Sequence, residues 1–231
     1  MSGHASYTQF INKIPDNINI YEVPIIKATD TSIKDYGKFV YNFENEKVIN
    51  KVWPKPIELL LNEDGTYKYT RTVDNNTGDE ALPTIGVFKS YYSNNYCYST
   101  NTSVRNGEYI IGVKPDIEKN TNNIYTREMN YHLCGGQIIK NRDKIPFLLL
   151  LSKANDFIKP EDCYLFHFDG SCGFQIYPNI WHQPLYPIIG ENIECITDNS
   201  QCSVHSCVSC DFVNEFNTLL QIKIPFQLSK I

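Results

Sequence analysis

Short runs of β-branched and aromatic residues recur along the chain and are separated by turn residues such as Asp64-Gly65 and Asn106-Gly107. Runs of this kind at regular spacing are typical of β sandwiches and barrels. The pattern therefore predicts an all-β fold with a few short helices. The expected strands cover residues 21–27, 38–43, 57–61, 84–92, 96–100, 108–114, 126–131, 136–140, 147–151, 164–168, 173–177, 193–197 and 218–224.

Other signals interrupt the strand pattern. Thr29 suits a helix N-cap and Gly37 suits a helix end, so a brief helix is expected between them. The segment Lys159–Asp162 predicts one helical turn, because its proline suits the first turn of a helix. Polar turns at residues 64–65 and 75–78 predict a solvated hairpin insertion over residues 62–82.

Length and composition predict one folded domain. The chain has 231 residues, of which 42% are hydrophobic and 20% charged, and this is ordinary for a globular protein. Residues 1–19 are polar and interrupted by Pro15, so we expect an N-terminal arm there and a single domain over residues 20–231. The net charge is -5 without a basic cluster, which argues against nucleic acid or an anionic membrane surface as partner.

The compartment can also be predicted. The longest apolar run, Ile145–Leu151, is far shorter than the roughly 20 residues of a membrane-spanning helix, and it predicts a buried strand. The first residues show no basic region followed by an apolar one, so we expect no secretory signal and a cytoplasmic location. The eight cysteines are then expected to be mostly reduced thiols.

One cysteine-rich segment carries ligands that suit zinc. Cys202, His205, Cys207 and Cys210 lie close together in sequence. Structural zinc sites usually close a longer loop between two ligand pairs, and this segment has no such loop. A cysteine-rich loop before the last strand is the favoured interpretation.

Two other segments contain polar residues that could form a single site. The first contains Asn130, His132 and Gln137, and the second contains the turn Pro178-Asn-Ile-Trp followed by His182. Side chains at positions 130 and 132 point to the same face of a strand, because side chains alternate with period two. A turn and the next strands can then bring Gln137 and His182 to the same place.

This arrangement resembles the cupin motifs, in which two His and a carboxylate precede a further His that follows a Pro/Gly turn. The stretch from Gly135 to Ile188 is similar to the core of the ureidoglycolate lyase family, formerly called ureidoglycolate hydrolases. The likeness covers residues 23–40 and, better, 130–216. The matching residues are His132, Gln137, Gly173, Trp181, His182, Pro184 and Leu185. It implies a cupin-type double-stranded β-helix barrel.

The resemblance implies elimination of urea from ureidoglycolate to give glyoxylate, a step of nitrogen or purine catabolism. His182 is the expected base, because an imidazole suits proton transfer near neutrality. His132 or Tyr177 would be the acid, and Gln137 and Gln183 would orient the ureido group. The expected residues are, for catalysis, His182, His132 and Tyr177; for substrate binding, Gln137, Gln183 and Asn130; and for a divalent metal ion, His132, Gln137 and His182.

The chain also departs from the family pattern. Asn130, Tyr177 and Gln183 stand where the family has Glu, His and His. A non-catalytic cupin that binds a small ligand or a protein is therefore the alternative. A metal-dependent oxygenase or isomerase is less favoured, because the acidic ligand is missing. The expected partner is a small polar molecule, and a homodimer is an open option.

Overall fold

The computed structural model describes residues 6–46, 83–102, 108–115, 122–132, 136–141, 144–188, 193–200 and 207–225. Strands dominate these residues and form two sheets, so the prediction of an all-β fold is confirmed. The predicted strand at 57–61 and the predicted hairpin at 62–82 lie outside the described residues.

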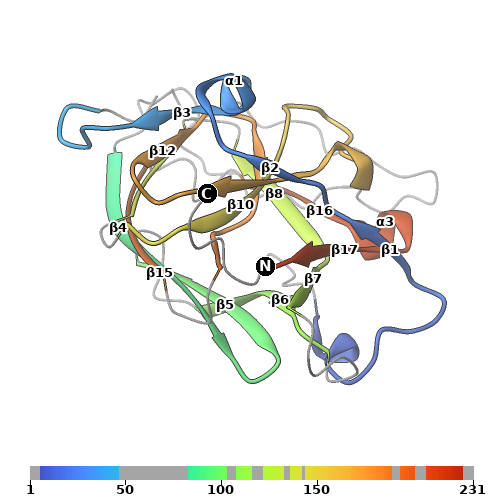
Figure 1. Ribbon diagram of the computed structural model, residues 1–231. Helices are drawn as coiled ribbons and strands as arrows, with labels where there is room; N and C mark the ends of the chain where they lie inside the picture. The colour runs from blue at the N-terminus through green and yellow to red at the C-terminus, as the bar shows by residue number, and fades with distance from the viewer. Residues whose placement is uncertain are drawn as a thin grey trace, which may run out of the picture.

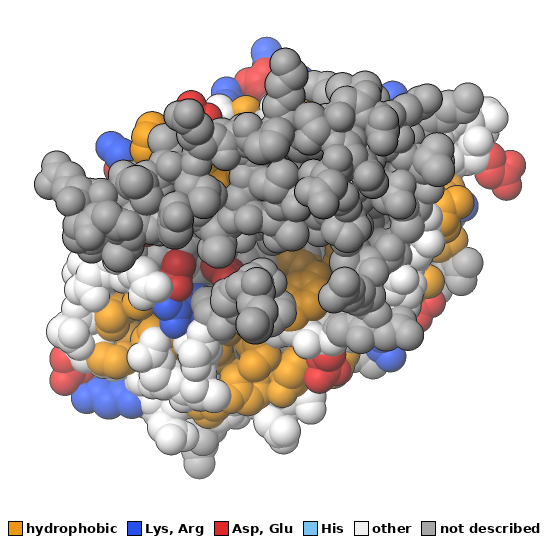
Figure 2. All heavy atoms as spheres, turned by 180° about the vertical axis from the view of Figure 1, so that it is seen from behind, with side chains coloured by type: hydrophobic (Ala, Val, Ile, Leu, Met, Phe, Trp, Pro, Cys, Tyr) orange, Lys and Arg blue, Asp and Glu red, His pale blue; other side chains and the backbone are white. Residues whose placement is uncertain are grey.

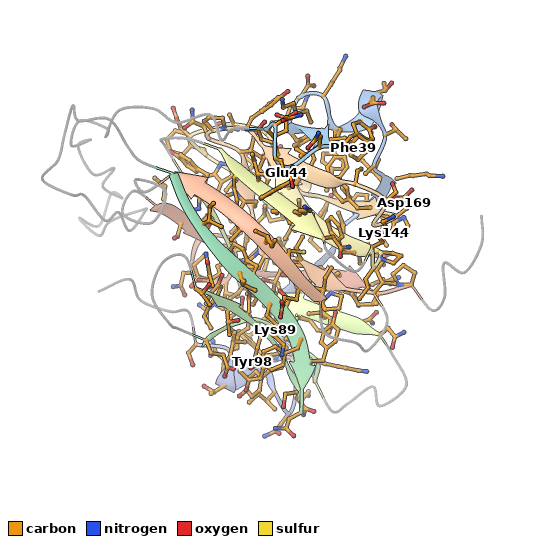
Figure 3. All side chains as sticks on the ribbon, turned by 90° about the vertical axis from the view of Figure 1, so that its left-hand side faces the viewer. Phe39, Glu44, Lys89, Tyr98, Lys144 and Asp169 are labelled. Atoms are coloured by element: carbon orange, nitrogen blue, oxygen red, sulfur yellow. The ribbon has the colours of Figure 1, made fainter. Side chains whose placement is uncertain are left out.

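The first sheet, called here the long sheet, has ten strands (Figure 1). In spatial order they are β1 (Asn19–Glu22), β17 (Thr218–Lys223), β7 (Asn123–Thr126), β6 (Glu108–Val113), β5 (Tyr96–Asn101), β4 (Pro83–Ser93), β15 (Ile193–Ser200), β9 (Gln137–Asn141), β12 (Gly173–Ile176) and β3 (Gly37–Val40). Figure 3 views this sheet from one side, with Lys89 of β4 and Tyr98 of β5 labelled.

The second sheet, called here the short sheet, has seven strands. Six follow the order β16 (Cys207–Asp211), β8 (Glu128–His132), β13 (Trp181–His182), β10 (Phe147–Ser152), β11 (Tyr164–Phe168) and β2 (Ile25–Lys27). The seventh, β14 (Tyr186–Pro187), also pairs with β10. In the part of the chain that the structure describes, neither sheet closes on itself.

The two sheets interleave along the chain. Strands β4, β15, β9 and β12 are antiparallel neighbours in the long sheet, and β8, β13, β10 and β11 are antiparallel neighbours in the short sheet. The chain crosses between sheets from β8 to β9, from β9 to β10, from β11 to β12 and from β12 to β13. These repeated crossings pack the two four-stranded groups face to face.

Strand β10 lies at the centre and is buried on both faces. Leu148 and Leu150 belong to one core cluster with residues of β6, β7 and β17. Phe147, Leu149 and Leu151 belong to a second cluster with residues of β9, β12 and β15. The long sheet therefore curves around the short sheet and covers both of its faces (Figure 1). Burial on both faces explains the unbroken apolar run that the sequence shows here.

Three sequence predictions need correction. The strand expected at 126–131 covers the end of β7 in the long sheet and most of β8 in the short sheet. The strand expected at 21–27 is two strands, because β1 pairs with β17 in the long sheet and β2 pairs with β11 in the short sheet. Pro24, which has no N–H to donate, lies between them, and its carbonyl accepts the N–H of Leu165. The loop expected up to Cys210 is also wrong in part, since residues 207–211 form β16 beside β8. Residues 201–206 lie outside the described part.

The helices are short. Thr29 caps α1 (Asp30–Ile33), as predicted, by accepting the N–H of Ser32, and β3 begins at Gly37. Turn η3 (Pro160–Asp162) also lies where the proline predicted a helical turn. Helix α3 (Phe212–Phe216), which the sequence pattern did not predict, is capped by the carboxylate of Asp211. No described helix has both the length and the apolar character needed to cross a membrane.

The first described residues pack into the domain. Turn η1 (Thr8–Phe10) ends in Phe10, and Tyr7 and Phe10 are buried in a third core cluster with Val113, Tyr125 and Leu219. The predicted N-terminal arm is therefore joined to the sheets by side-chain packing. On the back of the molecule, apolar, acidic and basic side chains mix over the described surface (Figure 2).

Candidate functional site

His132 and His182 lie side by side on the inner face of the short sheet. His132 is the last residue of β8, and His182 is the last residue of β13, directly opposite Asn130. The two imidazole ring centroids are 5.1 Å apart, and the rings are tilted by 58°. The family resemblance led us to expect these two histidines, which come from different motifs, at one site.

Alternation along the strands decides which way the two rings point. Met129 and Tyr131 of β8 and Trp181 of β13 face the first core cluster. The Tyr131 and Trp181 rings meet edge to face, 4.6 Å apart, and this contact ties β13 to β8. Their sequence neighbours His132 and His182 therefore face the opposite side, toward the second core cluster.

The backbone fixes the tautomer of His182. Its Nδ1 is 2.8 Å from the Ile180 carbonyl oxygen. A carbonyl can only accept, so Nδ1 carries the hydrogen and Nε2 keeps its lone pair in the neutral ring. Burial lowers the pKa of His182, and the hydrogen bond to Ile180 partly offsets this effect. His182 is therefore a neutral imidazole whose Nε2 can accept a proton or a hydrogen bond.

His132 is also neutral near pH 7. Its side chain is half-buried, and burial together with the neighbouring His182 lowers the pKa of His132 to about 3. The Nδ1 atom is closed to solvent and has no hydrogen-bond partner. A buried polar atom without a partner is uncommon in native proteins, and a bound molecule or water commonly satisfies such an atom.

Gln137 belongs to the long sheet, and its side of β9 is the one that faces the second core cluster, as the two histidines do. It begins β9, and it shares a strand face with Ile139, which belongs to the second core cluster. At the end of β8, Asn179, which follows β12, donates its backbone N–H to the His132 carbonyl over 3.0 Å. The Gln137 side chain is 5% exposed, and its Nε2 donates to Thr197 Oγ1 over 3.3 Å.

The remaining predicted residues take different positions. Asn130 shares the inner face with His182. Tyr177 lies at the same end of the sandwich, where its N–H donates to the Tyr36 carbonyl and its ring packs against the second core cluster. The buried Gln183 instead donates its side-chain amide to the Glu128 carbonyl, so this amide is already engaged within the fold.

Two residues near the site were not singled out from the sequence. Thr197 of β15 is fully buried and holds the amide of Gln137. Asn179 has a φ of 65°, and its Oδ1 is buried without a hydrogen-bond partner. The segment Pro178-Asn179 did carry a usable signal, because Asn tolerates the left-handed conformation that such turns require. Thr197 carried no local signal, since its role comes from pairing between β9 and β15.

The donor set does not match a divalent-ion site. His132, His182 and Gln137 supply two neutral imidazoles and one amide, without the carboxylate or third imidazole such sites usually contain. Among the described residues, no three His, Cys, Asp or Glu side chains gather to hold a metal ion. The zinc-compatible residues Cys202 and His205 lie outside the described part, as does the side chain of Cys207.

No model of a known protein family and no curated protein sequence matches this chain. A neutral imidazole with an available Nε2 can take a proton, and a neighbouring amide can orient a polar ligand. These groups suit acid–base chemistry or hydrogen-bonded recognition of a small uncharged group.

Proposed function

We propose that the chain has a cupin-type jelly-roll core. Eight strands form two groups of four neighbours, one within each sheet. Their orders are β4-β15-β9-β12 in the long sheet and β8-β13-β10-β11 in the short sheet. Jelly rolls, which include the cupins, distribute eight antiparallel strands over two sheets in this way. The paired histidines lie between these sheets, where a cupin carries its site.

We further propose that this site eliminates urea from ureidoglycolate. The contact between the His132 and His182 rings, with His182 held by the Ile180 carbonyl, is the observation that carries the proposal. It places a fixed, neutral base beside a second imidazole. The likeness to the ureidoglycolate lyase family at His132, Gln137 and His182 supplies the substrate.

The reaction uses this chain's own residues. Ureidoglycolate is a hemiaminal, so Nε2 of His182 removes the hydroxyl proton and the oxygen electron pair forms the glyoxylate carbonyl. The carbon–nitrogen bond breaks at the same time, and its electron pair stays on the urea nitrogen. Tyr177 then supplies a proton to this nitrogen, because the neutral His132 has no acidic proton to give near pH 7. Gln137 and Asn130 hold the substrate through hydrogen bonds.

Substitution of His182 tests the proposal. His182→Ala should lower the rate of glyoxylate release about 10²–10⁴-fold, because removing a general base commonly costs this much. His167→Ala is the matched control, since His167 is a half-buried histidine on β11 that takes no part in the proposed reaction. Purified wild-type protein that releases no glyoxylate from ureidoglycolate, with or without added divalent ion, would refute the lyase proposal.

A ligand-binding cupin without catalysis is the second candidate. It is favoured by one observation, namely that the side-chain nitrogen of Gln183 donates to the Glu128 carbonyl and is thus engaged within the fold. Under this proposal, a small ureido or amide compound binds between the two sheets and leaves unchanged. Calorimetric binding without turnover would select this candidate over the lyase.

A further inference from the structure

The side-chain amide of Gln137 is held through its nitrogen by a buried threonine. Thr197 has no exposed surface, and it lies on the inner face of β15 with Ile193 and Cys195, which belong to the second core cluster. Nε2 of Gln137 donates to Thr197 Oγ1 over 3.3 Å. With its nitrogen held by Thr197, the amide has its oxygen Oε1 left for a ligand, and this oxygen can only accept.

The neighbouring groups have the same polarity. Nε2 of His182 is an acceptor, because Nδ1 carries the hydrogen that is donated to Ile180. Asn179, bound through its N–H to the His132 carbonyl, has a buried Oδ1 that lacks a partner. Nδ1 of His132 is buried without a partner as well, and in the neutral ring it can be either donor or acceptor. Oε1 of Gln137, Nε2 of His182 and Oδ1 of Asn179 are therefore the neutral acceptors at this end of the sandwich.

We propose that Thr197 is a positioning residue that turns Oε1 of Gln137 toward the His132–His182 pair, so that the site selects ligands by an unsubstituted amide N–H group. The ligand class is a primary urea or carboxamide, held by its NH2 end. This inference rests on the proposed function in one respect, since both take the histidine pair as the ligand site. It adds the polarity of that site and the residue that sets it.

The two-sheet arrangement explains why Thr197 can have this effect. Thr197 is opposite Ile139 in the β9–β15 register, two positions along β9 from Gln137. The hydroxyl therefore reaches the glutamine diagonally on the same face of the long sheet. A buried hydroxyl needs a hydrogen-bond partner, and Val would fill the same volume without one. Val at position 197 would leave the glutamine amide free to rotate.

The test compares two ligands of nearly equal shape. Hydantoate ends in a urea NH2 group, and N-acetylglycine has a methyl group in its place. Wild-type protein should bind hydantoate about tenfold more tightly by titration calorimetry, because one amide hydrogen bond with buried acceptors is worth about this factor. Thr197→Val should reduce the preference to less than about threefold, and Thr197→Ser, which keeps the hydroxyl, should retain it.

Thr126→Val is the matched control. Thr126 is equally buried, and its Oγ1 bonds the hydroxyl of Tyr7 at 3.1 Å, away from the proposed site residues. It should lose similar stability and keep the full ligand preference. Equal binding of the two ligands by wild type, or binding of neither, overturns the inference whatever the enzyme assay shows. The same holds if Thr197→Val keeps the wild-type preference. Selective binding without turnover of ureidoglycolate supports the inference and refutes only the lyase proposal.

Discussion

Replacing Arg127 with Ala should strongly destabilise the protein. Its side chain is 5% exposed, and its guanidinium donates from Nε and Nη2 to the carboxylate of Asp211. Nη1 donates to the Ser6 carbonyl over 2.7 Å, and Nη2 also reaches Asn214. One buried cation thus holds the N-terminal segment, the end of β16 and the start of α3 together.

The expected loss of stability depends on the solvent exposure and hydrogen bonds that the Asp211 carboxylate keeps in the variant. Removing one partner of a buried ion pair costs about 3–5 kcal/mol, because the other charge is left uncompensated. The Asp211 side chain remains 23% exposed and still accepts the N–H groups of Val213 and Asn214. We therefore expect the lower end for Arg127→Ala, about 3 kcal/mol. For a chain of this length that loss corresponds to a fall in Tm of roughly 6–12 °C.

Urea unfolding measures this effect directly, provided that the m-value stays unchanged. Lys13→Ala is the control, because the Lys13–Asp16 pair is 63% and 87% exposed and should contribute about 0–1 kcal/mol. Limited proteolysis gives a second measurement, since Arg127→Ala should make residues near Ser6 more susceptible to cleavage. If the two variants lose the same free energy of unfolding, Arg127 does not hold the N-terminal segment, β16 and α3 together.

Two further predictions concern titratable groups. Burial lowers the pKa of His132 from 6.5 to about 3, so below pH 6.5 the unfolded chain binds a proton that the folded chain does not. Stability should therefore fall between pH 6.5 and pH 3, and His132→Gln should flatten this fall, whereas identical urea midpoints against pH for both proteins would contradict it. Among the five described thiols, half-buried Cys172 should react first with maleimide in the native protein, although burial raises its pKa. Peptide mapping that finds buried Cys97 or Cys195 labelled earlier would count against this packing.

Local patterns predicted much of the strand content. Strand β5 lies where its run of β-forming residues predicted a strand, and its side chains alternate between half-buried and buried. Strand β7 was missed, because Asn123 follows a polar stretch that resembles a loop. The split near Pro24 was missed for another reason. Each half pairs with a strand far away in sequence, and no local pattern shows the sheet that a strand joins.

The candidate site shows the same division. Alternation determined that Asn130 and His132 share one face of β8, because this depends only on backbone geometry. The family likeness led us to expect His182 near His132, and the structure gives their ring distance. The tertiary structure alone supplied Thr197 as partner of Gln137, since this contact arises where separate strands meet. It also determined that Gln183 bonds the Glu128 carbonyl. A sequence fixes the face that a side chain takes on its own strand, whereas the neighbour across the gap depends on how both sheets pack.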